Sequence, residues 1–560
     1  MELKKIDKSF AVAPQILPRE VEEIAVAGYK TIICNRPDGE GNDQPLFHEI
    51  EEAAGKAGLQ VHYLPVESGK VSDADAGKFA EAFEAAPKPV FAYCRSGTRS
   101  VTLWSLSRAG KMPLADILVA ARNAGYDMSG VVRRIANQGR MPSETIDASH
   151  EIVIVGAGSA GIAVAASLLA RAPDLDIAII DPADIHYYQP GWTLVGGGVF
   201  DAKETVRTLS SVLPEGVHWI KAAVAAFEPE RNVVLLEGCR AIRYKRLIVC
   251  PGLKLDWHKV EGLVDTLGKN GVTSNYRFDL APYTWKLVQE LKAGTALFTQ
   301  PPMPIKCAGA PQKALYLSAD HWFRNDVLDH IDIAFYNAGG VLFGVKDYVP
   351  ALMEYVEKYK AELKFSHNLV AVDGPARMAW FDQTDADGKV TRVERGFDMI
   401  HVCPPQSAPD FIRVSPLADQ AGWVDVDQNT LRHKTHENIW SLGDVMNAPN
   451  AKTAAAARKQ APVVAQNVLA DMGGKEGGGA AVGHYDGYGS CPLTVERGKI
   501  VLAEFGYGGK LLPSFPSWLI DGKRPSRAAW LLKEKILPPV YWQAMLRGKE
   551  WLAKPGPVKP

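Results

Sequence analysis

Residues 150–161, His-Glu-Ile-Val-Ile-Val-Gly-Ala-Gly-Ser-Ala-Gly, decide the fold of this 560-residue chain. An apolar strand runs into Gly156, Gly158 and Gly161, and an apolar helix over residues 162–170 follows. In such a turn one glycine bends the chain, one lets a pyrophosphate approach the backbone, and one packs the helix against the strand. The start of the helix then faces the phosphates. The stretch therefore predicts a Rossmann unit that binds a dinucleotide.

Two acidic positions indicate which dinucleotide is bound. Asp181 ends the next apolar strand, at the distance from Gly161 where a carboxylate can bind a ribose hydroxyl. Residues 441–444, Ser-Leu-Gly-Asp, end a later apolar run. They resemble the second FAD motif of flavoproteins with two dinucleotide-binding domains. That resemblance implies FAD as the cofactor, with Gly443 and Asp444 at the ribityl chain.

A second glycine turn, which such flavoproteins use for NAD, is missing where it is expected. The strand over residues 296–299 runs into a proline-rich stretch, 300–313, that carries Cys307. Prolines lack the N–H groups that would cradle a pyrophosphate. We therefore expect an electron partner other than NAD.

Seven cysteines in 560 residues are too few for a disulfide-stapled secreted scaffold. Cys307 has Lys306 and Lys313 nearby and precedes a helical run, two features that favour the nucleophilic thiolate. Cys491 has glycine and proline neighbours and is predicted to lie outside regular structure. The cysteines that end or follow apolar strands are predicted to be buried spectators: Cys34, Cys250 and Cys403.

Several further stretches, in order along the chain, resemble sulfide:quinone oxidoreductases of the mitochondrial type. They are residues 186–196, 306–313, 343–346, 421–427, 452–456 and 488–493. The resemblance adds Gln189, Pro190 and Lys452 to the expected cofactor-binding residues. It also implies a tandem Rossmann fold for the region from residue 150 onward.

The same resemblance implies a mechanism. Cys307 and Cys491, with Lys313 beside them, would form a redox pair next to FAD. Sulfide would attack Cys491, leaving a persulfide there and a thiolate at Cys307, and two electrons would pass through FAD to a quinone. A thiol or another nucleophile would then accept the sulfane sulfur. Cysteine suits both steps because sulfur is at once nucleophile, electrophile and leaving group.

The first 140 residues predict a separate small domain. Strands at 31–34, 61–64 and 90–93 alternate with helical patterns at 73–86 and 100–109, which is typical of a parallel α/β fold. The predicted organisation is a domain over 1–140, a linker over 141–149, a flavoprotein region over 150–472, and a C-terminal region over 473–560 that begins with a glycine-rich hinge.

A second reactive cysteine is expected in this first domain. Residues 94–99, Cys-Arg-Ser-Gly-Thr-Arg, join a strand to a helix, so backbone N–H groups, Arg95 and Arg99 would cradle an anion beside the Cys94 thiol. Cysteine phosphatases use a seven-residue C-x5-R loop, whereas this C-x4-R loop has the six-residue form of rhodanese-type sulfurtransferases. Ser100 stands where the phosphatase arginine would be.

Two activities stay open for this domain. Residues 1–140 resemble a small phosphatase-like family found beside, or fused to, bacterial sulfide-oxidation enzymes, with residues 35–40 as a further match. The loop length and the fusion favour a sulfurtransferase that carries persulfide on Cys94. A phosphatase is the alternative. It would need a general acid, for which the sequence offers Glu67, Asp73 and Asp75.

Two other function classes also remain for the whole chain. A type II NADH:quinone dehydrogenase shares the fold and the membrane, but it predicts the missing second glycine turn. A phosphatase carrying an inactive flavoprotein as a scaffold predicts that the cysteine pair is dispensable.

Charge is balanced overall but uneven along the chain. The 63 Lys and Arg offset 64 Asp and Glu, which disfavours a nucleic-acid binder, and no metal site is predicted. Residues 510–560, however, hold ten Lys and Arg against three acids, with four of the 13 tryptophans. Such a mixture favours a membrane surface, and residues 528–552 are predicted to lie there as an in-plane helix. A solvated helical pair packed on the protein is the alternative.

The sequence also supports an expectation about location. The N-terminal residues carry charges where a signal peptide needs an apolar run, and no uninterrupted apolar stretch is long enough for a spanning helix. We expect a peripheral protein on the cytoplasmic face of a bacterial inner membrane. A homo-oligomer is compatible with the sequence.

Overall fold

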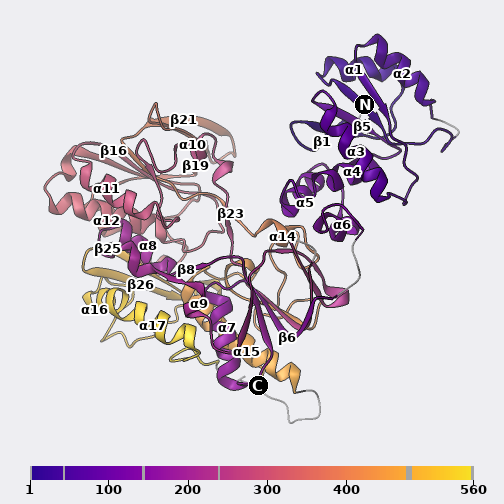
Figure 1. Ribbon diagram of the computed structural model, residues 1–560. Helices are drawn as coiled ribbons and strands as arrows, with labels where there is room; N and C mark the ends of the chain where they lie inside the picture. Colours follow the sequence, from indigo (N-terminus) through magenta and orange to yellow (C-terminus); the bar gives the residue numbers. More distant parts are fainter. Residues whose placement is uncertain (1–2, 42–43, 142–145, 238–239, 474–481, 556–560) are drawn as a thin grey trace. The chain divides into compact units, whose positions relative to one another are not determined.

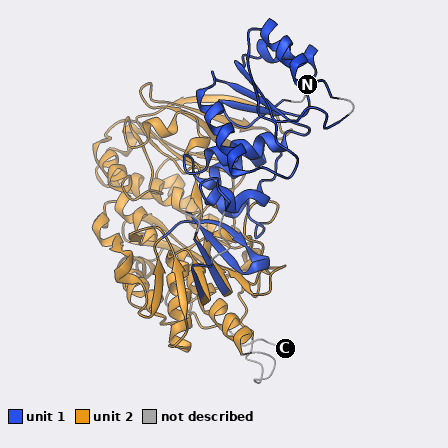
Figure 2. Cartoon of the chain, turned by 45° about the vertical axis from the view of Figure 1, so that its right-hand side comes forward, with its two compact units in different colours: residues 1–149, 222–244, 410–418 blue, residues 150–221, 245–409, 419–560 orange. Residues whose placement is uncertain are grey.

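The computed structural model describes residues 3–41, 44–141, 146–237, 240–473 and 482–555 (Figure 1). Most of the predicted glycine hinge, part of the predicted linker and Cys239 lie outside these residues. The chain forms two compact units (Figure 2). Unit 1 comprises residues 1–149, 222–244 and 410–418, and unit 2 comprises residues 150–221, 245–409 and 419–560.

Unit 1 contains a five-stranded sheet with helices on both faces, which confirms the predicted α/β fold. The strand order is β1 (Lys4–Lys5), β2 (Phe10–Ala13), β5 (Val90–Tyr93), β3 (Thr31–Cys34) and β4 (Gln60–Tyr63). Strands β2 to β5 are parallel, and β1 is antiparallel to β2. The helices are α1 (Val21–Val26), α2 (Phe47–Lys56), α3 (Asp73–Ala85), α4 (Thr98–Arg108), α5 (Leu114–Asn123) and α6 (Val132–Ala136).

The buried residues of these strands alternate between two cores, because successive side chains of a strand point to opposite faces. Ala11 and Phe91 pack with α1 and α2, whereas Phe10, Val12 and Ala92 pack with the aromatic residues of α3 and α4. The second core also includes a hairpin from much later in the chain, β11 (Val224–Glu228) and β12 (Val233–Leu236). Unit 1 therefore includes residues that the sequence analysis assigned to the flavoprotein region.

Unit 2 contains the predicted tandem Rossmann arrangement. Its first sheet includes β10 (Val217–Ile220), β7 (Ile177–Ile180), β6 (Ala148–Val155), β13 (Ala241–Val249) and β24 (Ile439–Ser441). Two helices that pack on each other accompany it, α7 (Ser159–Arg171) and α15 (Ala454–Met472). Strand β7 and the C-terminal parts of β6 and β13 are buried and apolar, as parallel strands covered on both faces usually are.

The second sheet is parallel, and an antiparallel sheet lies beside it. Its strand order is β15 (Val272–Thr273), β22 (Met399–His401), β16 (Gly294–Gln300), β17 (Ile331–Asn337) and β18 (Glu362–Phe365). Its helices are α11 (Ala281–Glu290), α12 (Ala310–Arg324) and α13 (Val349–Lys358). The antiparallel sheet consists of β19 (His367–Asp373), β20 (Met378–Thr384) and β21 (Val390–Gly396).

The C-terminal part differs from two expectations. Cys491 does not lie in irregular structure but in β25 (Gly489–Glu496), which pairs with β26 (Lys499–Phe505) and packs on α12. Pro492 is tolerated there because each strand of a two-stranded hairpin is an edge strand and can leave a ladder bond unmade. The segment expected as one long helix is divided into α16 (Arg527–Leu531), a π-helical turn (Leu532–Ile536) and α17 (Leu537–Gln543).

Within the described part of the chain, no helix is long and apolar enough to cross a membrane.

Candidate active site

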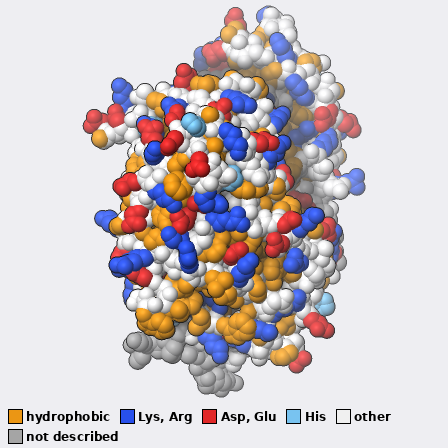
Figure 3. Space-filling view, turned by 90° about the vertical axis from the view of Figure 1, so that its left-hand side faces the viewer, with side chains coloured by type: hydrophobic (Ala, Val, Ile, Leu, Met, Phe, Trp, Pro, Cys, Tyr) orange, Lys and Arg blue, Asp and Glu red, His pale blue; other side chains and the backbone are white. Residues whose placement is uncertain are grey.

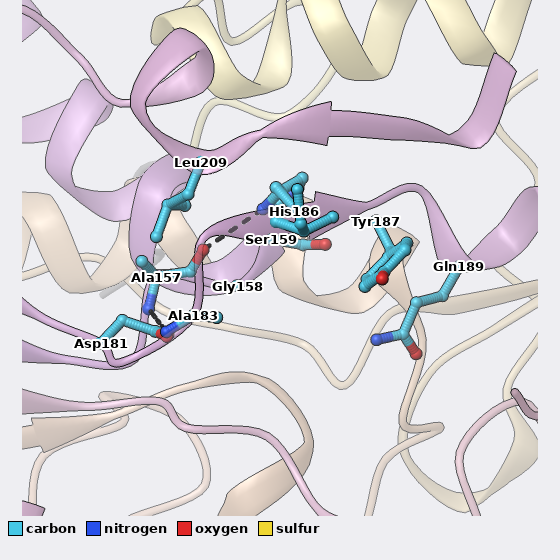
Figure 4. A pocket seen from close by; sticks show the side chains of 10 residues that line it. Ala157, Gly158, Ser159, Asp181, Ala183, His186, Tyr187, Gln189 and Leu209 are labelled. Atoms are coloured by element: carbon cyan, nitrogen blue, oxygen red, sulfur yellow. Dashed lines mark hydrogen bonds between the residues drawn. The ribbon is translucent and has the colours of Figure 1, made fainter. Parts of the chain in front are cut away.

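The predicted glycine turn joins β6 to α7 and requires glycine for steric reasons. Gly156 has a φ of +101°, and a Cβ placed there would lie 2.6 Å from the carbonyl oxygen of Cys250. A Cβ on Gly161 would lie 1.8 Å from the oxygen of Gly156. A pocket lies beside this turn, at the start of α7 (Figure 4). It is lined by Ala157, Gly158, Ser159, Asp181, Ala183, Ile185, His186, Tyr187, Gln189 and Leu209.

Asp181 lines the same pocket, directly after β7. Its carboxylate accepts hydrogen bonds from the N–H groups of Ala157, at 2.7 Å, and Ala183, at 2.8 Å (Figure 4). The first of these bonds ties the strand end to the glycine turn. Asp181 therefore helps to shape the pocket. Its position agrees with the predicted role of its carboxylate in binding a ribose hydroxyl.

The second predicted FAD motif lies against the same helix. Gly443 has a φ of +80°, and a Cβ there would lie 3.1 Å from the Cβ of Ala160 on α7. Asp444 follows it, and the Nζ of Lys452 donates to the Asp444 carbonyl oxygen at 2.7 Å. Burial raises the pKa of the Asp444 carboxyl against the opposing effect of Lys452, and burial lowers the pKa of Lys452 to about 8.

Lys452 also connects this motif to Cys307. Its carbonyl oxygen accepts a hydrogen bond from the Cys307 N–H at 2.8 Å. On the other side, the Nζ of Lys306 donates to the Oε1 of Gln189 at 2.6 Å and lies 5.7 Å from the ring centre of Trp192. The structure thus brings the expected cofactor-binding residues and Cys307 into one continuous site.

Cys307 and Cys491, far apart in the sequence, meet at the start of α12. Cys307 has a φ of +46°, an uncommon conformation for a residue with a side chain. Its Sγ accepts a hydrogen bond from the Nζ of Lys313 at 3.0 Å. A Cβ on Gly309 would lie 2.3 Å from the Cδ2 of Leu493 on β25, so glycine lets this strand approach the turn closely and bring Cys491 near it.

The two thiols differ in their acidity. A hydrogen bond from Cys491, followed by the nearby charge of Lys313, holds the pKa of Cys307 well below the usual range, although burial opposes this effect. The hydrogen bond to Cys307 and burial raise the pKa of Cys491 well above the usual range. When the pair is reduced, Cys307 is therefore the thiolate, and the Cys491 thiol donates a hydrogen bond to it. Such a pair is suited to forming and breaking a disulfide.

The structure adds two residues to this site that the sequence analysis did not single out. The hydroxyl of Tyr276 donates to the carbonyl oxygens of Lys306, at 3.2 Å, and Cys307, at 3.4 Å. Lys533, in the π-helical turn, is only 4% exposed, and its Nζ donates to the Pro190 oxygen at 3.3 Å. In the sequence Lys533 is one of ten basic residues in the tail, and nothing distinguishes it from the others.

In unit 1, Cys94 is fully buried between β5 and α4. The Gly97 N–H points to its Sγ at 3.1 Å, and Gly97 has a φ of +88°. Arg95 is exposed, whereas Arg99 is buried. The guanidinium of Arg99 donates to the Val66 oxygen at 2.6 Å and to Glu40 at 2.8 Å.

Residues around this loop are tied to one another. Glu40 also accepts a hydrogen bond from Arg36 at 2.8 Å, and the Ser100 hydroxyl donates to Asn35 at 2.9 Å. The three carboxylates considered as general acids have partners elsewhere: Asp73 binds Arg134, Asp75 caps α3 through Ser72, and Glu67 binds Lys70. The Cys94, Cys34, Cys250 and Cys403 side chains are all buried.

Fold and site together define the class: a flavoprotein with two Rossmann units and a cysteine pair where a second nucleotide turn would be. The model of the pyridine nucleotide-disulphide oxidoreductase family matches residues 150–297. The chain is 41% identical over 408 residues to the mitochondrial sulfide:quinone oxidoreductase of Dictyostelium discoideum, covering 72% of this chain and 87% of that protein. The chain therefore belongs to the sulfide:quinone oxidoreductase family, and its cofactor is FAD.

A solved structure shares the fold, and two further comparisons concern the N-terminal region. The X-ray structure of the sulfide:quinone oxidoreductase from Aquifex aeolicus shares the fold, with a TM-score of 0.59 at 18% identity over 72% of this chain and 92% of that one. Residues 2–111 match the phosphatase-like domain of the beta-lactamase hydrolase-like protein family. A protein of that name from Agrobacterium fabrum is 32% identical over 140 residues, 25% of this chain and 32% of that protein.

The residues present fit FAD. The pocket at the α7 N-terminus has the glycines and Asp181 that an adenine dinucleotide needs, and Asp444 lies beside the same helix. The buried Trp192 Nε1 and Thr193 Oγ1 have no hydrogen-bond partner among the described residues. Both belong to α8 (Trp192–Gly196), next to Gln189 and Lys306. A bound cofactor would give such orphaned groups a partner.

Proposed function

We propose that this chain oxidises sulfide and transfers two electrons to a quinone, with Cys307 and Cys491 as the reacting pair. The observation that carries the proposal is the unequal acidity of the two cysteines. Lys313 binds the Cys307 thiolate at 3.0 Å, and Cys491 is the neighbouring thiol, next to the residues expected to bind FAD. Family membership supports sulfide and a quinone as the two substrates.

In the oxidised enzyme the two cysteines form a disulfide, and sulfide attacks the Sγ of Cys491. The S–S bond breaks, so Cys491 carries a persulfide and Cys307 leaves as the thiolate. Cys307 is the better leaving group because Lys313 stabilises its negative charge. A thiol or another nucleophile then takes the outer sulfur, and loss of two electrons restores the disulfide. Bound FAD supplies the two-electron acceptor that passes these electrons to the quinone.

An anaerobic titration tests this proposal. Purified protein is titrated with sulfide, then with a short-chain quinone, while the flavin absorbance is recorded. We expect sulfide to bleach the flavin and the quinone to restore it. Bleaching by NADH but not by sulfide would instead favour a type II NADH:quinone dehydrogenase, which the cysteine at the second nucleotide turn argues against.

We also propose that the C-terminal segment binds the membrane that holds the quinone. Figure 3 looks onto the side where α16 and α17 lie in Figure 1, and hydrophobic side chains there are interspersed with Lys and Arg. The large apolar side chains that the segment exposes are Trp518, Leu519, Leu531, Ile536, Trp551 and Leu552. Exposed tryptophan and basic residues favour an anionic lipid interface. The particular membrane stays a prediction.

Liposome flotation tests the membrane contact without removing the segment, because Lys533 belongs to the site. Trp518→Ser combined with Trp551→Ser should reduce binding to vesicles containing anionic lipid. Trp219→Ser, on β10, serves as the control. Equal flotation of the double variant and the wild type would contradict the proposal.

A second activity is proposed for the Cys94 loop, that of a sulfurtransferase. The supporting observation is the six-residue loop, in which a backbone N–H rather than a side chain contacts the thiol and Ser100 binds Asn35. The test supplies full-length protein with thiosulfate and cyanide, and separately with an aryl phosphate, with Cys94→Ser as the control. Phosphatase turnover without sulfur transfer, lost in Cys94→Ser, would establish the alternative.

A further inference from the structure

Two buried lysines from different parts of the chain act on the cysteine pair: Lys313 by direct contact with Cys307, and Lys533 through its charge. Lys313 extends from α12 and is 2% exposed, and Lys533 extends from the π-helical turn and is 4% exposed. Burying two cations together is costly unless negative charge is nearby or one of them gives up its proton. The thiolate of Cys307 can compensate only one of them fully.

The surroundings shift the pKa values of the two ammonium groups in opposite directions. Burial disfavours the charge of Lys313, but the attraction of the Cys307 thiolate outweighs it and raises the pKa of Lys313. For Lys533, burial and then the repulsion of Lys313 lower the pKa to about 7, against the opposing attraction of Cys307 and Cys491. When the pair is reduced, Lys313 therefore keeps its proton, whereas Lys533 can exchange a proton at neutral pH. Separated acidities of this kind distinguish a fixed charge from an acid–base group.

Local structure supports a dedicated role for Lys533. Its Nζ donates to the Pro190 oxygen, in the turn Gln189–Gly191 that also binds Lys306. The π-helical turn directs Lys533 inward, while Lys535, two residues later, is 65% exposed at its side chain and pairs with Glu534. Single π-helical turns occur frequently at functional sites.

We propose that Lys533 accepts the proton released when hydrogen sulfide adds to Cys491, and that the resulting cation helps Lys313 to hold Cys307 as the thiolate. The step balances. Hydrogen sulfide and the Cys307–Cys491 disulfide give the protonated Cys491 persulfide, the Cys307 thiolate and one proton, which neutral Lys533 binds at Nζ. One S–S bond replaces another, so no external oxidant is consumed in this step.

This inference rests on the proposed function, and its first test does not require sulfide. The holoenzyme is reduced with dithiothreitol, without dithionite. Mass spectrometry then measures the rate at which iodoacetamide alkylates Cys307 at each pH. Lys533→Met should move the midpoint for thiolate formation upward by about one pH unit, because one nearby charge is lost. Lys533→Arg keeps the charge and should retain the wild-type midpoint, and Lys535→Met should have no effect.

The second test follows flavin reduction by sulfide in single turnovers from pH 6 to 9. Lys533→Met should slow reduction at least about tenfold at neutral pH, as loss of a general base does. Lys533→Arg should also be slow despite its normal alkylation profile, since arginine cannot accept the proton. Wild-type rates in both variants would overturn the proposal, as would an unchanged midpoint in Lys533→Met. If sulfide fails to reduce even the wild type, the proposed function itself fails, whatever the alkylation shows.

Lower flavin content or a lower melting temperature in Lys533→Met, without a shifted midpoint, would show that Lys533 is structural and would likewise overturn the proposal.

Discussion

Cys94 and Cys307 occupy the same kind of position, the turn between a parallel strand and the helix that follows it, yet their thiols are held in different ways. Around Cys94, the contact comes from within the loop itself, the Gly97 N–H at 3.1 Å. The Cys307 thiol is held by Lys313 and Cys491, and the Cys307 N–H donates to the carbonyl of Lys452; Cys491 and Lys452 come from distant parts of the chain. A loop can stabilise one thiolate by itself, whereas a redox pair needs a partner delivered by the fold.

The largest effect should come from breaking the pair in unit 2. Cys307→Ser should lower sulfide-dependent quinone reduction by about a thousandfold or more, since a serine can neither form the disulfide nor leave as a thiolate. The control is Cys403→Ala, which removes a buried cysteine from the same hydrophobic cluster. Steady-state quinone reduction measures both. Sulfide oxidation that survives in Cys307→Ser would show that the pair is dispensable.

The next effect should appear in unit 1 alone. In Gly97→Ala, a Cβ would lie 2.1 Å from the Tyr126 hydroxyl at a φ of +88°, so the loop must distort. Sulfur transfer from thiosulfate to cyanide should fall by about tenfold to a hundredfold, while sulfide:quinone activity should stay at the wild-type level. Gly110→Ala has a similar φ, +75°, but no neighbour closer than 3.6 Å, which makes it the matched control. Equal transfer rates in Gly97→Ala and the wild type would place the activity elsewhere.

A pH-dependent effect should separate charge from shape in the cysteine pair. Lys313→Met removes the cation bound to Cys307, so the pKa of this thiol rises and less thiolate is present at low pH. We measure the rate of flavin reduction by sulfide against pH, and the acid limb of this profile should therefore move upward by about one pH unit. Lys313→Arg keeps a positive charge, so its acid limb should lie between those of Lys313→Met and the wild type. If the acid limb of Lys313→Met lies at the same pH as that of the wild type, Lys313 does not stabilise the Cys307 thiolate during the reaction.

The smallest effect should be on the stability of unit 1. Arg99 and then Arg36 lower the pKa of Glu40, so this carboxylate stabilises the fold above its unfolded pKa of about 4.3 and loses that contribution as pH falls. Glu40→Gln should cost about 1–2 kcal/mol at pH 7 and less at pH 4, allowing for partial solvent screening. Hydrogen exchange of the Val90–Tyr93 amides measures this. Glu52→Gln, at an exposed pair, should change nothing.

Local patterns predicted much of this molecule. The strands at 31–34 and 90–93, the glycine turn before α7 and the burial of Cys34, Cys250 and Cys403 are all found as expected. These features depend on neighbours within a few residues, or on hydrophobicity alone. The strand position of Cys491 was missed because the pairing with β26, rather than the local Gly and Pro, determines it. The helix expected over 528–552 contains a π-helical turn before Pro538 and Pro539 and ends at Gln543.

By itself, the sequence determined the Rossmann class, the position of the missing nucleotide turn and the loop that encloses Cys94, because turn glycines, prolines and strand–helix order act locally. Family resemblance paired Cys307 with Cys491. Only the tertiary structure decided which thiol is ionised, and that a lysine of the basic tail turns inward to the Pro190 carbonyl. The physical reason is that acidity and proton exchange depend on burial and on the distances between charges, and residues remote in the sequence set both.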